Sequence, residues 1–164
     1  MTASAPPRNK AGQGTGATQA ARLAAVQALY EMEISHARLD DVVLDVVSNR
    51  WIEIPEAGAS AQPDKPKFKK IVRGVSGDAA KLDEMIAGSL DGGRTPDSLD
   101  ILLRNLLRAA AFELFQMPEV PAKVVVNEYL NMAHAFFSEG EPALVNGVLD
   151  RLARVLRGAE MDAK

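Results

Sequence analysis

The sequence predicts an all-α protein, a helical bundle of about six to seven helices arranged as two packed three-helix sub-bundles. Apolar residues recur at three- and four-residue spacings along most of the chain, and Gly and Pro residues separate these stretches. No segment shows the strict alternation typical of a half-buried strand. The 164 residues, 47% hydrophobic and 25% charged, have the composition of one globular domain.

The composition also predicts where the domain begins and ends. Residues 1–18 contain no Leu, Ile, Val or aromatic side chain, so we expect a flexible N-terminal tail. The helical domain is expected at 19–158, followed by a short C-terminal tail at 159–164. Within the domain, residues 53–66 are rich in Pro and Gly and are expected to form the loop between the sub-bundles.

Three helices are expected in the first half of the chain, at residues 22–35, 39–52 and 68–90. The second of these is rich in Val, but its helical period and the acidic pair Asp40 and Asp41 in its first turn favour a helix over a strand. The third contains Gly74 and Gly77. Glycine inside a helix is unfavourable by about 1 kcal/mol relative to Ala, so close helix packing is expected there.

Three more helices are expected in the second half, at residues 96–116, 121–139 and 142–157. Thr95 followed by Pro96 is a strong helix start, because Thr can cap free N–H groups and Pro is tolerated in the first turn. The helix that follows has a wide apolar face built from Leu, Ala and Phe residues. It is therefore expected to be the central helix of the bundle.

The residues for catalysis are scarce. The chain has no Cys, which excludes thiolate nucleophiles and cysteine metal sites. His36 and His134 have no partner at a metal-ligand spacing and are expected to be surface or packing residues. No apolar run is long enough to span a bilayer and the N-terminus lacks a secretory signal, so a cytoplasmic protein without a membrane segment is expected. We therefore expect that the protein is not an enzyme and that it binds no metal or cofactor.

Basic residues offer the clearest candidates for binding. Lys67, Lys69 and Lys70 belong to a cluster of five cations within nine residues, which could hold phosphates or simply form a solvated helix start; the sequence leaves both open. Arg8 and Lys10 add a sparse cationic arm before the first helix. The net charge is −3, so the whole molecule is not a polycation.

Four segments carry a resemblance to the NusB family of bacterial transcription antitermination factors. They read A-R-L-A-A-V-Q-A-L-Y-E-M-E (21–33), L-L-R-A-A-A-F-E-L (106–114), V-P-A-K-V-V-V-N-E (120–128) and E-P-A-L-V-N-G-V-L-D-R (141–151). The resemblance covers roughly residues 20–157 in the same order. It implies an all-helical protein that binds the boxA element of nascent RNA together with NusE, a ribosomal small-subunit protein. The pair helps to assemble an antitermination complex on RNA polymerase during ribosomal RNA synthesis, and no reaction is catalysed.

The resemblance also implies roles for individual residues. Arg22 would contact RNA phosphate, and Gln27 and Tyr30 lie on the RNA-binding segment of the first helix. For Tyr30, contact with a base and half-buried packing are both open. The arm is poorer in Arg than family arms often are, so we expect a lower RNA affinity and a flatter salt dependence.

The surface for NusE is expected around Glu139, Gly140, Glu141 and Leu144, where acidic residues could complement a basic ribosomal protein. Gly140 and Leu144 stand where family members commonly have an acidic residue and Phe. The polar residue Glu113, inside one of the motifs, is as compatible with a hydrogen bond between helices as with a binding role.

Two other functions stay open at this point. The chain could be a helical RNA-binding module that acts in trans with a ribosomal RNA methyltransferase, because a NusB-like domain also occurs in such enzymes. It could also be an adaptor that binds protein and no RNA, which the poorly charged arm permits. Whether the free protein forms a homodimer cannot be inferred from periodicity.

Overall fold

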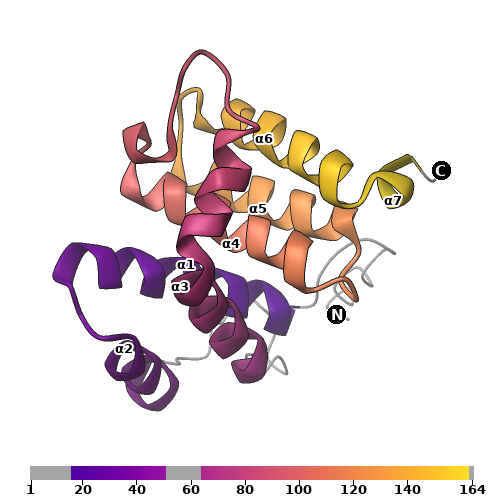
Figure 1. The fold of residues 1–164 in the computed structure, drawn as a ribbon. Coiled ribbons are helices and arrows are strands. Elements are labelled where there is room, and N and C mark those ends of the chain that lie inside the picture. The colour runs from indigo at the N-terminus through magenta and orange to yellow at the C-terminus, as the bar shows by residue number, and fades with distance from the viewer. Residues whose placement is uncertain (1–15, 51–63, 163–164) are drawn as a thin grey trace, which may run out of the picture.

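The computed structural model describes residues 16–50 and 64–162. Within these ranges there are seven α-helices and no β-strand, which confirms the all-α prediction. The helices are α1 (Gly16–Ser35), α2 (Leu39–Asp45), α3 (Lys65–Ala87), α4 (Ile101–Gln116), α5 (Ala122–Phe136), α6 (Glu141–Leu156) and α7 (Gly158–Asp162). Helix α3 packs against α1 and α4, and α5 packs against α4 and α6, so the two expected three-helix groups share one continuous set of contacts (Figure 1). As expected, α4 is central, because it packs against α1, α3, α5 and α6.

Helix α1 begins earlier than the composition indicated. Its first residue is Gly16, so residues 16–18 are helical and were wrongly assigned to the tail. Three alanines within residues 17–21 explain the extension, since Ala has the highest helix propensity. The rest of the expected tail, residues 1–15, lies outside the described part of the chain.

The Val-rich segment that follows is helical, as its period predicted. Asp40 and Asp41 lie in the first turn of α2, where their charges face the positive end of the helix dipole. Val42 is buried, and a π-helical turn, Val46–Arg50, continues the chain. The remainder of the expected helix and most of the expected loop, residues 51–63, lie outside the described residues.

Helix α3 starts before the end of the expected loop. Its first residue is Lys65, and the Asp64 carboxylate caps the helix by accepting a hydrogen bond from the Lys67 backbone N–H at 3.0 Å. Pro66 occupies the first turn, where its missing N–H would be unpaired in any case. The proline therefore begins the helix, and the predicted boundary after residue 66 was wrong.

The two glycines inside α3 differ in their surroundings. A Cβ atom on Gly74 would lie 2.1 Å from the ring of Phe112, which confirms that α3 and α4 approach closely there. Gly77 has no neighbour within 4 Å of its Cβ position, so close packing was wrongly expected at this residue. It precedes Asp78, whose φ of −112° and ψ of 17° interrupt the regular helix.

Helix α4 begins five residues later than predicted. Pro96–Ser98 form a separate 3₁₀ turn, and the chain is extended at Leu99. The Asp100 side chain then caps α4 by accepting hydrogen bonds from the N–H groups of Leu102 and Leu103. The expected helix at 96–116 would include Asp100, but its cap shows that Asp100 stands at the start of the helix and not inside it.

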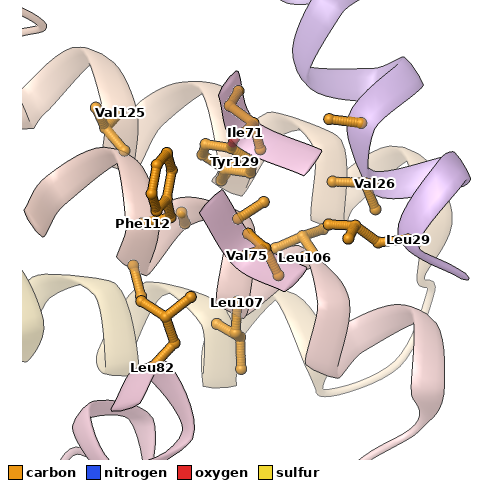
Figure 2. Close-up of a cluster of buried hydrophobic side chains, with 14 of the residues drawn as sticks. Val26, Leu29, Ile71, Val75, Leu82, Leu106, Leu107, Phe112, Val125 and Tyr129 are labelled. Atoms are coloured by element: carbon orange, nitrogen blue, oxygen red, sulfur yellow. The ribbon is translucent and has the colours of Figure 1, made fainter. Parts of the chain in front are cut away.

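The core lies where these helices meet. Figure 2 shows apolar side chains of α1, α3, α4 and α5 directed toward one another, among them Val26, Ile71, Leu106 and Val125, each fully buried. Burying one side chain of this size contributes about 1.5–3 kcal/mol. The stripes found in the sequence therefore converge on one shared core.

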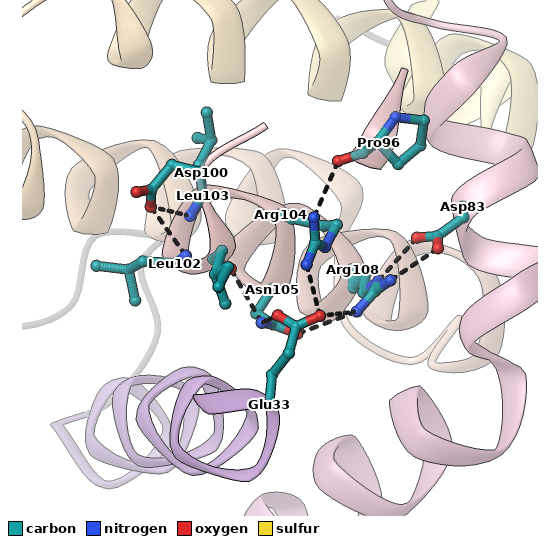
Figure 3. Close-up of polar contacts among 10 residues, drawn as sticks. Glu33, Asp83, Pro96, Asp100, Leu102, Leu103, Arg104, Asn105 and Arg108 are labelled. Carbon is teal, nitrogen blue, oxygen red and sulfur yellow. Dashed lines mark hydrogen bonds and ion pairs between the residues drawn. The ribbon is translucent and has the colours of Figure 1, made fainter. Parts of the chain in front are cut away.

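A polar network joins α1, α3 and α4 beside this core (Figure 3). Arg108 donates two hydrogen bonds of 2.7 Å to the Asp83 carboxylate, and Arg104 pairs with Glu33. Asn105 also donates to Glu33, at 3.0 Å. These groups are largely shielded from solvent, so the network fixes how the first helix sits on α4.

The C-terminal residues are also ordered. The prediction of a tail at 159–164 was wrong for the described residues, since α7 spans Gly158–Asp162. The Arg157 guanidinium donates to four backbone carbonyls at the end of α4 and in the turn after it, those of Glu113, Leu114, Met117 and Val120. Glu160 accepts from the Ala122 N–H and so caps α5. The segment therefore joins two helix ends.

Candidate nucleic-acid and protein interfaces

Gln27 and Tyr30, two of the residues expected to contact RNA, lie on the outward face of α1. Gln27 and Tyr30 are three residues apart, which places them on one side of the helix. Both are exposed, Tyr30 at 40%, whereas Val26 and Leu29 on the other side are buried. Of the two possibilities for Tyr30, the structure favours an accessible ring, since an aromatic ring can stack on a base only if solvent can reach it.

Arg22, by contrast, does not reach the surface. It is only 1% exposed, and its guanidinium forms a bidentate pair with Glu113, with Nε 2.8 Å from Oε2 and Nη2 3.0 Å from Oε1. The expectation that Arg22 contacts RNA phosphate does not hold in this structure. The physical reason is that α4 supplies a buried carboxylate, which retains the cation inside.

Lys67 is likewise directed inward. Its Nζ lies 2.9 Å from Glu113 Oε1 and the residue is 8% exposed, so it is not available for RNA in this conformation. The Tyr129 hydroxyl donates to Glu113 as well. One carboxylate on α4 therefore receives groups from α1, α3 and α5, and we call these four residues the Glu113 cluster.

In this cluster, burial and the neighbouring positive charges shift the pKa of Glu113 in opposite directions. Burial alone would raise the pKa of Glu113, but the hydrogen bond and charge of Arg22, with help from Lys67 and Tyr129, outweigh it and hold that pKa below its usual value. Burial and the Glu113 charge raise the pKa of Tyr129 well above 10. At neutral pH the carboxylate is ionised and the phenol is protonated, so each acceptor oxygen has donors.

The remaining lysines of the predicted cluster are on the surface. Lys69 and Lys70 are exposed, and Lys70 lies 3.9 Å from Glu119 in a pair that solvent reaches on both sides. The start of α3 adjoins the start of α1, since the Asp64 N–H donates to the Ala17 carbonyl at 3.3 Å. The arm that carries Arg8 and Lys10 precedes this point, but those two residues lie outside the described part of the chain.

The predicted partner-binding residues gather at the start of α6. Gly140, Glu141 and Leu144 line a cleft of about 350 Å³, and Glu139 is exposed beside it. The opposite wall comes from the segment that enters α4, which the sequence did not indicate as part of this site. Those residues are Arg94, Ser98, Leu99, Asp100 and Leu103.

The cleft combines apolar walls with carboxylates. Leu103 and Leu144 provide apolar surface, and Asp100 and Glu141 provide negative charge, which Arg94 offsets in part. The Oε2 atom of Glu141 is buried and accepts no hydrogen bond from the described residues. A buried carboxylate oxygen without a donor is unfavourable, so a donor from a binding partner would stabilise it.

Neither a metal site nor a membrane segment is found in the described residues. No group of three or more His, Asp or Glu side chains there could hold a metal ion. None of the described helices is both long and apolar enough to cross a bilayer. His36 and His134, both exposed, have no such neighbours.

Comparison with known proteins identifies the family. The NusB family model matches residues 19–154. The chain belongs to the NusB family. A protein of Bradyrhizobium sp. strain ORS 278, named transcription antitermination protein NusB, is 44% identical over 88% of this chain and 86% of its own length. A protein of the same name from Brucella ovis is 44% identical over 88% of this chain and 84% of its length. Both relatives are named as transcription antitermination proteins.

Solved structures agree on the NusB fold. NusB of T. maritima has a TM-score of 0.73 and 22% identity, and the match covers 92% of this chain and 99% of that one. A structure of the antitermination factors NusB and NusE in complex with double-stranded RNA has a TM-score of 0.68 and 22% identity, covering 84% of this chain and 96% of that one. At this identity the likeness establishes the fold.

Proposed function

We propose that the protein is an antitermination factor that binds boxA RNA together with NusE and helps to assemble the antitermination complex on RNA polymerase during ribosomal RNA synthesis. Membership of the NusB family supports this proposal, as does the complex of a structural relative with NusE and RNA. The observation that carries the RNA-binding part is the exposed pair Gln27 and Tyr30 on α1. Such a pair is suited to single-stranded RNA, whose bases are unstacked and accessible.

The two residues of this pair have different chemistry. The Tyr30 ring can stack on a base, and its hydroxyl can donate or accept a hydrogen bond. The Gln27 amide has donors and an acceptor that can bind a base edge. Lys69 and Lys70, with Arg8 and Lys10 of the arm, supply positive charge for phosphates. Arg22 and Lys67 act indirectly, since through the Glu113 cluster they fix α1 against α3 and α4.

The cleft at the start of α6 is the proposed surface for NusE. Glu139, Gly140, Glu141 and Leu144 lie in or beside it, and Asp100 adds a second carboxylate to its wall. A basic ribosomal protein complements this charge, because a Lys or Arg side chain can donate to Glu141 while its aliphatic part packs on Leu144. The apolar walls give such a contact its packing.

A titration of the purified protein with labelled RNA tests the RNA-binding part. Fluorescence anisotropy is measured with a boxA-containing RNA and with a scrambled RNA of equal length, at two salt concentrations. We expect tighter binding of the boxA RNA, and a loss of that preference in Tyr30→Ala. Equal and weak binding of both RNAs under all conditions would contradict the proposal.

One observation favours a second candidate, an adaptor that binds protein and no RNA. Arg22 and Lys67, two of the cations expected to bind RNA, are buried in ion pairs. Calorimetric titration with NusE, in the absence and in the presence of boxA RNA, separates the two candidates. An adaptor would bind NusE with an affinity that boxA RNA does not change, whereas an antitermination factor would bind NusE more tightly when boxA RNA is present.

A further inference from the structure

The outward face of α3 carries a regular line of cations. Lys65, Lys69 and Arg73 recur at every fourth residue, which places them on one side of the helix, and all three are exposed. A different side of the helix faces the core, since Phe68 and Ile71 are fully buried. With a rise of 1.5 Å per residue, successive cations are about 6 Å apart along the helix. We call these three residues the cationic row.

The acidic groups around the cationic row are weak competitors for a ligand. Arg73 lies 3.5 Å from Asp40, but both side chains are more than half exposed, and exposed pairs of this kind contribute little. Among the described residues, no carboxylate forms an ion pair with Lys65 or Lys69. Asp64, beside the row, is engaged in capping α3 through the Lys67 N–H.

The row also has a defined place in the fold. It begins beside the first turn of α1, because the Asp64 N–H donates to the Ala17 carbonyl. The chain that precedes this turn contains Arg8 and Lys10. The row therefore continues from the point where the cationic arm joins the domain, and runs along α3 toward α2, which Arg73 contacts through Asp40.

We propose that the cationic row is a track for the phosphates of single-stranded RNA, which holds the RNA backbone without reading its sequence. The inference rests on the proposed RNA-binding function and assigns base contacts to α1 and phosphate contacts to α3. The row has no stacking platform, because Phe68 is buried and no other aromatic residue stands between Lys65 and Arg73. Gln27 and Tyr30 on α1 carry the sequence-dependent contacts, and the row carries contacts that position the strand.

Salt dependence gives this division a measurable signature. Each phosphate neutralised on a single strand contributes about 0.7 to the slope of log K against log salt concentration. Loss of three contacts should therefore flatten the slope by about 2. Between 50 and 200 mM salt, this difference corresponds to the wild type losing about 20-fold more affinity than the variant.

The experiment compares two triple variants with equal loss of charge. In the row variant, Lys65→Gln, Lys69→Gln and Arg73→Gln are combined. The control combines Arg38→Gln, Lys123→Gln and Arg154→Gln, which are exposed, lie outside α3 and do not line the cleft. Anisotropy titrations use boxA RNA and scrambled RNA over a series of salt concentrations, and circular dichroism monitors folding. We expect the row variant to bind both RNAs more weakly by a similar factor, with the flatter slope and an unchanged preference for boxA.

A further variant tests whether positive charge, and not the identity of the side chain, accounts for the effect. A row with Lys65→Arg and Lys69→Arg should bind as the wild type does, since the charge is kept. If the wild type selects boxA RNA but the row variant keeps the slope of the control, the cationic row is not a phosphate track. If the wild type binds neither RNA, the proposed function and the track both fail.

Discussion

Arg22 of α1 and Glu113 of α4, 91 positions apart in the chain, form a bidentate ion pair in the interior of the protein. Lys67 of α3 and Tyr129 of α5 contact the same carboxylate. One ionised group thus joins four helices, two from each half of the bundle. This arrangement explains why residues expected to bind RNA are buried, and it makes Glu113 the point at which the fold is most sensitive to a change of charge.

Removing that charge should destabilise the fold strongly. Glu113→Gln leaves Arg22 and Lys67 buried without their anion, and breaking a buried pair in this way costs about 3–5 kcal/mol. Urea unfolding followed by circular dichroism measures the difference. The matched control is Glu119→Gln, whose carboxylate is exposed and 3.9 Å from Lys70, and which should change stability by less than about 0.5 kcal/mol. Equal effects of the two substitutions would contradict the role given to Glu113.

The same cluster predicts a pH dependence. Because the pKa of Glu113 is lowered on folding, its contribution to stability is fully present above the unfolded value of 4.5 and is lost as pH falls through the folded value. The difference in unfolding free energy between wild type and Glu113→Gln should therefore be constant above about pH 6 and shrink below about pH 4.5. A difference that stays constant down to pH 3 would show that Glu113 does not titrate as described.

The packing of α3 on α4 predicts opposite effects for two similar substitutions. Gly74→Ala would place a methyl group 2.1 Å from the Phe112 ring, so the ring must move, at a cost of about 1–3 kcal/mol. Gly77→Ala meets no atom within 4 Å and should instead stabilise the helix by up to about 1 kcal/mol. Thermal unfolding of both variants gives the test. Equal changes of the same sign would be inconsistent with this packing.

On the RNA-binding face, two substitutions of Tyr30 separate stacking from hydrogen bonding. Tyr30→Ala removes the ring and should weaken boxA binding by about 1–3 kcal/mol, the range for one stacked base. Tyr30→Phe keeps the ring and removes the hydroxyl, so its loss should be smaller. Anisotropy titrations at one salt concentration compare them, and unchanged affinity in Tyr30→Ala would remove Tyr30 from the interface.

At the cleft, Glu141→Gln should weaken NusE binding, because it removes the charge that a basic side chain would meet. The effect should diminish at high salt, where charge interactions are screened. Calorimetric titration at low and high salt measures both affinities. Glu119→Gln, remote in the fold from the residues of the cleft, should bind NusE as the wild type does.

The helices and the core were largely predictable from the sequence, because a helix records its buried face as a local pattern of apolar residues. Errors occurred at helix boundaries, because a few hydrogen bonds determine where a helix starts and ends. Asp100 was placed inside a helix because proline at 96 suggested an earlier start. The chain instead has two caps in succession, Thr95 before the 3₁₀ turn and Asp100 before α4. The composition of residues 16–18 resembled a tail, yet the helix extends through them.

The candidate site was predictable only in part. A sequence shows that Arg22 and Lys67 are charged, but not which distant carboxylate pairs with them. One signal was present, since Glu113 stands between Phe112 and Leu114 at the end of a long apolar stretch, and an acidic residue there needs a buried cation. The wall of the cleft near Asp100 left no such signal, because it depends on how α4 meets α6.

The most direct test of the central claim is the affinity for boxA RNA, measured by anisotropy with and without saturating NusE, against a scrambled RNA of equal length. If the protein binds RNA and NusE jointly, NusE should raise the affinity for boxA RNA selectively, and boxA RNA should raise the affinity for NusE by the same factor. An affinity for boxA RNA that does not change with NusE and equals that for the scrambled RNA would contradict the account.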